Sequence, residues 1–326
     1  MIIDCHAHFV PTSLVAAIHQ KAITFPSLNL VYHEDAFGLS FSGGKATRPI
    51  PKLLTDVTNR LEWMDEQRID IQIVGGWLDM FGYELPGEEG ARWARLINKH
   101  MVDFVNEQDR FVPLATVPLQ DGELAAEVLQ EAHAQGFKGV MIGTQPKGTG
   151  GVLDDPSLDP FWETAHELGS MIFIHPVFES GDNRVHEYGL ANAVGRITDT
   201  LIAVSRIIYS GHVLRYNKAK IIVGIGGAAL PFVLGRLRRN YLIDTSLADP
   251  DASLKMLYYD TITQDHRSLR FLAEIVTADR IMLGSDMPFP IGDPEPMKVV
   301  AAAGFSASEV ASINGGLAKK LIDREN

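Results

Sequence analysis

Short apolar runs alternate along this chain with longer stretches of helical periodicity. The apolar runs have the length expected of buried strands. They cover residues 1–8, 70–75, 111–116, 138–143, 171–175, 220–224, 257–260 and 280–286. Between several of them, apolar residues recur every three or four positions, which predicts helices. These segments are residues 88–107, 122–135, 158–168 and 189–215.

Strands that alternate with helices predict an α/β fold with a parallel sheet. Eight such strands favour a single (β/α)8 TIM barrel, and a chain of 326 residues can form one as a single domain. A doubly wound open sheet is the alternative, but no glycine-rich phosphate loop follows the first strand. Residues 12–60 are irregular in pattern and rich in Gly and Pro breakers, so we expect an insertion or lid after the first strand.

The composition is that of an ordinary globular protein, with 46% hydrophobic and 21% charged residues. A formal net charge of −12 without a basic block argues against binding to nucleic acid or to an anionic membrane. Cys5 is the only cysteine, so no internal disulfide can form, which fits a reducing cytoplasm. We find neither a signal peptide nor an apolar stretch that could span a bilayer. The expected partner is therefore a small molecule in the cytoplasm.

Three of the predicted strands end in residues that bind metal ions. His6 and His8 lie two apart on the first strand, so their imidazoles share one face. The fifth strand ends at His175 and the eighth at Asp286. Functional residues collect at the carboxyl ends of barrel strands, and the first and eighth strands are neighbours when a barrel closes. We expect these four side chains to hold one divalent ion, for which Zn²⁺ is favoured and Mn²⁺ is possible.

The motifs of this chain resemble those of the amidohydrolase superfamily. Within it, they are similar to the branch of aminocarboxymuconate-semialdehyde decarboxylase and related aromatic acid decarboxylases. The resemblance runs nearly end to end and depends on residues 3–8, 60–65, 139–144, 175–176, 231–236 and 283–290. It implies a mononuclear Zn²⁺ site with the four ligands above, a homodimer, and decarboxylation of a small unsaturated or aromatic carboxylic acid.

The same resemblance indicates two arginines for a substrate carboxylate. Arg48 lies in the expected insertion, where these decarboxylases have a substrate-binding arginine. Arg236 matches an arginine that the partner subunit supplies. A guanidinium can hold a carboxylate through two hydrogen bonds. A solvated surface position is the alternative for each, because most arginines are exposed.

One position departs from the pattern of the decarboxylases. After the sixth strand they have a histidine that handles protons, followed by a Gly-Gly pair, whereas this chain has Ile225. An isoleucine side chain can neither give nor take a proton. Asp79, which follows the second strand, and Asp286 are the first candidates for proton transfer. His186 and His212 are weaker candidates.

Ile225 leaves other functions open. Hydrolysis of a small amide or lactone would need only Asp286 as a base and a water activated by the metal. A binding module without catalytic activity is a third alternative, which the four retained ligands disfavour. Asp260, at the end of the seventh strand, could point at the site or begin a turn.

Overall fold

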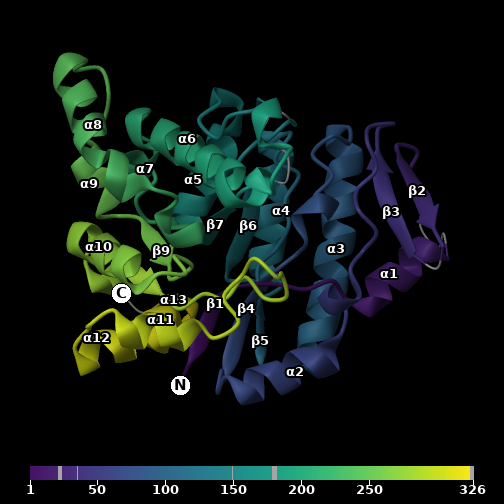
Figure 1. Cartoon of the computed structure of the whole chain (residues 1–326). Coiled ribbons are helices and arrows are strands. Elements are labelled where there is room, and N and C mark those ends of the chain that lie inside the picture. The colour runs from purple at the N-terminus through teal and green to yellow at the C-terminus, as the bar shows by residue number, and fades with distance from the viewer. Residues whose placement is uncertain (21–23, 35, 149, 178–181, 324–326) are drawn as a thin grey trace.

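The computed structural model describes residues 1–20, 24–34, 36–148, 150–177 and 182–323 (Figure 1). Two parallel sheets form its centre, in the order β1-β4-β5 and β6-β7-β8-β9-β10. The strands are β1 (Ile3–His8), β4 (Ile71–Gly75), β5 (Phe111–Pro113), β6 (Gly139–Gly143), β7 (Met171–His175), β8 (Lys220–Val223), β9 (Tyr258–Asp260) and β10 (Ile281–Met282). Most of their residues are buried on both faces, which is why the strands are nearly continuous apolar runs in the sequence.

Two contacts join these sheets into a ring. Ala115, just after β5, pairs in parallel with Val140 of β6. On the opposite side, Ala7 of β1 pairs in parallel with Met287, five residues beyond the end of β10. The predicted (β/α)8 barrel is therefore confirmed, and the open sheet is excluded because its two edge strands would not meet.

Helices surround the ring (Figure 1). They are α2 (Val57–Glu66), α3 (Gly87–Glu107), α4 (Gly122–Ala134), α5 (Asp159–Leu168), α6 (Arg196–Tyr209), α7 (His212–Arg215), α8 (Leu230–Ile243), α9 (Pro250–Leu254), α10 (His266–Val276), α11 (Pro296–Ala302), α12 (Ala307–Ala311) and α13 (Leu317–Asp323). Local signals set several of their ends: the Asp121 carboxylate accepts the N–H of Leu124 at the start of α4, and Gly169 ends α5 in the left-handed conformation. The four predicted helical segments are confirmed.

The segment after β1 is more regular than its sequence indicates. It forms α1 (Thr12–His19) and an antiparallel hairpin of β2 (Leu28–His33) and β3 (Ala36–Phe41), which lies beside α3 in Figure 1. The expectation of irregular structure over residues 12–60 is wrong for these elements, while residues 21–23 and 35 lie outside the described residues. The buried side chains of β3 pack with Trp93 of α3, so tertiary contacts rather than a local pattern stabilise the hairpin.

A buried polar network lies beneath the carboxyl end of β1. The Asp4 carboxylate accepts hydrogen bonds from the amide of Gln72 at 2.8 Å and from the N–H of Ser285 at 3.0 Å. Arg60 of α2 donates to the Gln72 side chain at 2.9 Å and to the carbonyl of His8 at 2.8 Å. Burial lowers the pKa of Arg60 to about 10, although the charge of Asp4 acts in the opposite direction. The network ties α2, β1 and β4 to the segment after β10.

We predict that Arg60→Ala lowers the free energy of unfolding by about 3–5 kcal/mol, because it leaves the buried Asp4 charge without its counter-charge. Urea denaturation followed by circular dichroism measures the change. Arg68→Ala, at an exposed position just after the same helix, is the matched control and should leave the midpoint unchanged. Equal midpoints for the two variants would contradict a structural role for the network.

Candidate metal centre

Three histidines at the carboxyl ends of β1 and β7 direct their Nε2 atoms to one point, while each Nδ1 atom contacts an oxygen of the protein. The Nδ1 atom of His6 is 2.6 Å from the Asp260 carboxylate. The Nδ1 atom of His8 is 3.0 Å from the carbonyl of Gly76, and that of His175 is 2.8 Å from the carbonyl of Pro176. Since a carbonyl oxygen can only accept, His8 and His175 carry their protons on Nδ1. Their Nε2 lone pairs are thus available to a ligand.

The Nε2 atoms converge on the carboxylate of Asp286. Its Oδ1 atom lies 3.1 Å from Nε2 of His8, 3.5 Å from Nε2 of His6 and 3.9 Å from Nε2 of His175. All four candidate ligand atoms lie within 4.8 Å of one another. Among the described residues, the Nε2 atoms of His6 and His8 and the Oδ1 atom of Asp286 are buried without a hydrogen-bond partner. Buried polar atoms are rarely left so, and this set fits one divalent cation.

The backbone holds Asp286 beside β1. Its N–H donates to the carbonyl of His6 at 2.8 Å, and its φ angle is +59°. A non-glycine residue is seldom found in this left-handed region and stays there when its surroundings compensate for the strain. Gly292 packs closely against the backbone next to Asp286. A Cβ on Gly292 would come within 2.3 Å of the Ser285 carbonyl oxygen. The loop after β10 thereby aims the carboxylate at the three imidazoles.

Burial and mutual charge set the protonation states of the four residues. Burial lowers the pKa of His8, and lowers that of His175 to about 3, so both imidazoles are neutral. Burial acts in the same direction on His6, but its hydrogen bond to Asp260 and the nearby Asp286 raise its pKa overall. Burial alone would raise the pKa of Asp286, but His175, His8 and His6 hold it below its usual range. Neutral imidazoles and an ionised carboxylate are the forms that bind a metal, and on His6 the metal competes with a proton.

Asp260 supports the centre from below, a role that the sequence left undecided. Its carboxylate accepts four hydrogen bonds: from the ring of His6, from the N–H groups of Ile225 at 3.1 Å and Gly226 at 2.6 Å, and from that of Ile262 at 3.1 Å. A carboxylate with so many donors is fixed in place. It orients the His6 ring and increases the basicity of Nε2. No signal in the sequence distinguishes this arrangement from an ordinary turn.

The structure places Ile225 at the edge of the centre. It follows β8, is partly buried, and adopts a φ angle of +55°. A Cβ on the preceding residue, Gly224, would lie 3.5 Å from Cε1 of His6, so this loop passes close to the imidazole. A β-branched residue with positive φ is strained. In return, the strained conformation directs the Ile225 N–H at Asp260.

Arg48 and Asp79 lie together at a cavity of about 410 Å³, whose wall also contains Val177, two residues beyond His175. The Arg48 guanidinium donates to Oδ2 of Asp79 through Nη2 at 3.2 Å and Nε at 3.3 Å. It also lies 5.5 Å from the centre of the Trp77 ring. Burial raises the pKa of Asp79, while the charges of Arg48 and Arg196 lessen the rise.

Other candidates from the sequence lie elsewhere. Arg236 is exposed on α8 and is not among the residues that converge on the centre. His186 is exposed after a short 3-10 helix. His212 is buried, with its Nδ1 atom 2.8 Å from the hydroxyl of Ser210 and its Nε2 atom 3.5 Å from Asp159. Sequence reasoning missed Arg196 at the start of α6. Burial lowers its pKa, while the charges of Asp286 and Asp79 act in the opposite direction.

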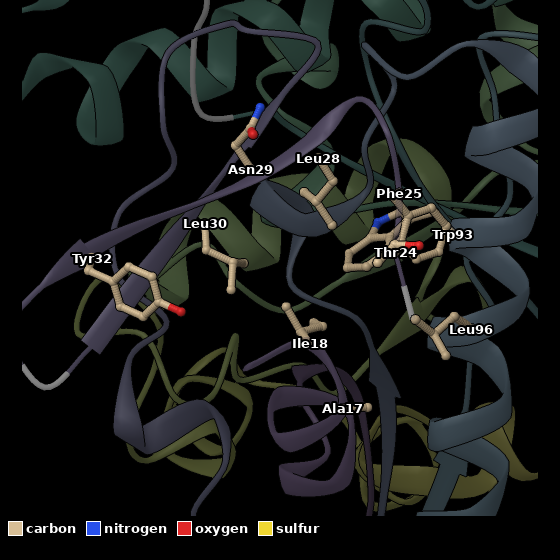
Figure 2. A pocket seen from close by; sticks show the side chains of 10 residues that line it. All are labelled: Ala17, Ile18, Thr24, Phe25, Leu28, Asn29, Leu30, Tyr32, Trp93 and Leu96. Carbon is tan, nitrogen blue, oxygen red and sulfur yellow. The ribbon is translucent and has the colours of Figure 1, made fainter. Parts of the chain in front are cut away.

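A second pocket, of about 290 Å³, lies between α1, β2 and α3 (Figure 2). Its wall is mostly apolar and includes Ile18, Leu28, Leu30 and Trp93. None of the four candidate ligands lines it. We therefore place the chemistry at the carboxyl ends of the barrel strands and not in this pocket.

Comparisons with known proteins agree with the architecture. A family model described as "Amidohydrolase" matches residues 3–324. The chain belongs to the amidohydrolase family. A related protein is 2-amino-3-carboxymuconate-6-semialdehyde decarboxylase of Dictyostelium discoideum, which is 27% identical over 329 residues, covering 98% of this chain and 91% of the relative. The resemblance inferred from the sequence motifs is thus confirmed.

Solved structures show the same fold. The structure of 5-carboxyvanillate decarboxylase from Sphingomonas paucimobilis superposes on this amidohydrolase with a TM-score of 0.82 at 23% identity, covering 99% of this chain and 98% of the other. Dihydroxybenzoic acid decarboxylase from Polaromonas sp. JS666 was solved with manganese and the inhibitor 2-nitroresorcinol. It gives a TM-score of 0.78 at 21% identity, covering 100% of this chain and 97% of the other.

Among the described residues, we find no helix long and apolar enough to cross a membrane.

We predict that Asp260→Asn weakens metal binding by about 10–100-fold, because the amide cannot accept all four hydrogen bonds and no longer fixes the His6 ring. Competition with a chromogenic chelator measures the affinity. Asp265→Asn is the control. Asp265 precedes α10 and caps its first turn, and asparagine is an equally good N-cap residue. Equal affinities for Asp260→Asn and the unmodified protein would contradict the supporting role.

Proposed function

We propose that this amidohydrolase is a divalent-metal-dependent decarboxylase of a small unsaturated or aromatic carboxylic acid. The observation that carries the proposal is the convergence of His6, His8, His175 and Asp286, with buried ligand atoms that lack protein partners, beside a cavity that contains Arg48. The decarboxylases among its relatives favour the same reaction. We assign the four residues as the ligands of a single ion.

Three imidazoles and one carboxylate suit Zn²⁺, which we propose as the ion, although the manganese in the related Polaromonas structure keeps Mn²⁺ as the alternative. A divalent ion in this position would stabilise negative charge on a substrate oxygen as a Lewis acid. The protein's own residues would do the rest. They orient the acid, exclude water and move the proton.

Arg48 is suited to orient the substrate. It lines the cavity together with residues 44–47, which belong to the segment after β1 that we propose as a lid or wall of the site. Its pairing with Asp79 and its contact with Trp77 fix the direction of the guanidinium. A guanidinium held in this way can form two hydrogen bonds to a carboxylate. The substrate would replace part of the pairing with Asp79.

Asp79 is our candidate for the proton donor. Decarboxylation needs a proton at the carbon next to the departing carboxylate, so that the electrons of the C–C bond are accepted when CO2 leaves. A carboxyl group whose pKa is raised by burial keeps a proton near neutral pH more readily than an exposed one. When Arg48 turns to the substrate, the pKa of Asp79 would rise further. Asp286 is the second candidate, but its lowered pKa keeps it ionised, so it holds no proton to donate.

Hydrolysis of a small amide or lactone is the alternative that Ile225 leaves open. In that reaction, Asp286 would take a proton from the attacking water and pass it to the leaving group. Ile225 supports this alternative, because its side chain cannot transfer a proton at the position where the decarboxylases of the branch have a histidine.

We further propose a homodimer in which Arg236 completes the partner's site. The outer surface of α8 carries exposed apolar side chains, with Phe232 74% and Ile243 68% exposed, and lies on the opposite side of the molecule from the hairpin (Figure 1). Apolar side chains of this size on a monomer's surface often mark an interface.

A free, buried Cys5 is consistent with the cytoplasmic location that we propose.

We predict that the metal-loaded protein releases CO2 from an acid within a panel of ortho-hydroxy aromatic and unsaturated carboxylic acids. Removing the metal with a chelator, or the ligand in His175→Ala, should lower the rate by about 100-fold or more, and metal should restore it only in the unmodified protein. Headspace analysis of CO2 with chromatography of the products measures the reaction. A new carboxylate formed from amides or lactones without CO2 would support hydrolysis instead.

We also predict that Ile225→His raises the rate of CO2 release by about tenfold or more, because it supplies a proton-transferring group beside His6. Ile225→Asn is the matched control, since asparagine also tolerates positive φ and is polar but does not transfer protons at neutral pH. Steady-state kinetics compares the two variants. Equal rates for both would argue that proton transfer does not occur at this position.

A further inference from the structure

The hairpin of β2 and β3 has one apolar face, and only half of it is buried. Side chains two apart in a strand share a face, and so do opposite residues of an antiparallel pair. The face is formed by three opposite pairs: Leu28 and Phe41, Leu30 and Leu39, and Tyr32 and Phe37. All three members on β3 are buried, whereas those on β2 are partly buried or exposed, and Tyr32 is 54% exposed. The β2 half therefore presents apolar surface that its surroundings cover only in part.

This half of the face forms one wall of the pocket between α1, β2 and α3 (Figure 2). Leu28 and Leu30 lie on the side of β2 that faces Ile18 of α1 in Figure 2. Phe25 and Trp93, with 7% and 0% of their surface exposed, also line the pocket, so it extends below the surface of the molecule. Sites for small molecules are concave and mostly apolar in this way, whereas the surface of another protein would meet only the rim.

Size and charge narrow the class of ligand. The volume of about 290 Å³ is nearly twice that of an engineered cavity of about 150 Å³ that holds benzene, so one ring or two fused rings fit. No charged side chain is among the described residues that line the pocket, and its polar groups belong to Thr24, Asn29 and Tyr32. The Arg92 guanidinium lies 5.2 Å from the centre of the Phe25 ring and does not line the pocket. An ion in this space would lose hydration without gaining a counter-charge, so the ligand is uncharged.

Trp93 separates the pocket from the cavity that contains Arg48. Its Nε1 atom donates to the carbonyl of Met80 at 2.6 Å, and Met80 follows Asp79 directly in the chain. A Cβ on Gly82, which lines the cavity, would lie 3.0 Å from Cδ1 of Trp93. No described residue lines both spaces. The pocket is thus a separate site that lies behind one wall of the cavity.

We propose that this pocket binds an uncharged aromatic molecule of one or two rings, at a site separate from the metal centre. Trp93 and Phe25 stand edge to face with ring centres 5.3 Å apart, and a third ring can extend this arrangement. The bound rings would cover the exposed apolar surface of β2, and a hydroxyl group on them can pair with Thr24, Asn29 or Tyr32. The inference does not depend on the proposed reaction, whose substrate carries a carboxylate and is excluded from the pocket by its charge.

Calorimetric titration of the metal-loaded protein with 2-naphthol tests the proposal. Ala17 of α1 lines the pocket and is partly buried, so Ala17→Phe would place a ring inside the space. We expect 2-naphthol to bind, and Ala17→Phe to weaken this binding by about tenfold or more, because the ligand loses its apolar contacts. 2-Naphthoate has a carboxylate in place of the hydroxyl group. It should bind equally to the unmodified protein and to Ala17→Phe, because any binding of this anion takes place at the metal centre.

Ala16→Phe is the matched control, because Ala16 is the exposed neighbour on the same helix and does not line the pocket. It should keep the full affinity for 2-naphthol. The proposal is overturned if 2-naphthol does not bind, if Ala17→Phe and Ala16→Phe bind it equally, or if Ala17→Phe weakens 2-naphthoate as much as 2-naphthol.

Leu30→Thr is the second variant, used if Ala17→Phe melts below the unmodified protein. It removes apolar surface from the wall of the pocket, and threonine is a good strand-forming residue. We expect it to weaken the binding of 2-naphthol by about threefold or more. An unchanged affinity in Leu30→Thr would place 2-naphthol elsewhere on the protein and would overturn the proposal.

Discussion

The pairing of β1 with the segment that follows β10 is the constraint on which the site depends. The N–H of Cys5 donates to the carbonyl of Leu283 at 2.7 Å, and the N–H of Asp286 donates to the carbonyl of His6 at 2.8 Å. These hydrogen bonds close the barrel and set the register between two segments at opposite ends of the chain. A shift of one residue would turn His6 and His8 away from the interior. Barrel closure and site assembly are therefore the same event.

The polar residues of β1 have two different roles: Asp4 supports the fold, and His6 and His8 are candidate metal ligands. Asp4, His6 and His8 alternate with Ile3, Cys5 and Ala7, so the polar side chains point into the barrel and the small or apolar ones toward the helices. Asp4 is satisfied by protein donors, whereas the Nε2 atoms of both histidines are not. Burying such groups is costly unless a partner is present. The centre thus gains stability from a cation, and the protein around it fixes the ligands before the cation binds.

Sequence patterns predicted much of this arrangement. The barrel followed from eight apolar runs, and the ligand group followed from polar residues at the ends of buried strands, where packing does not require them. The hairpin was missed because its stability comes from packing on Trp93 rather than from a local pattern. The support by Asp260 was undecided because it depends on backbone N–H groups of residues far away in sequence. Arg196 carries no motif, and the position of α6, which begins with it, depends on hydrogen bonds of Asp199 to residues that follow β6.

The most direct test is a crystal structure of the metal-loaded protein with anomalous diffraction measured at the absorption edge of the ion. The account predicts one strong anomalous peak, with Nε2 of His6, His8 and His175 and a carboxylate oxygen of Asp286 at about 2.0–2.2 Å from it. Full loading in solution with no peak at this position, or a peak among other residues, would contradict the account.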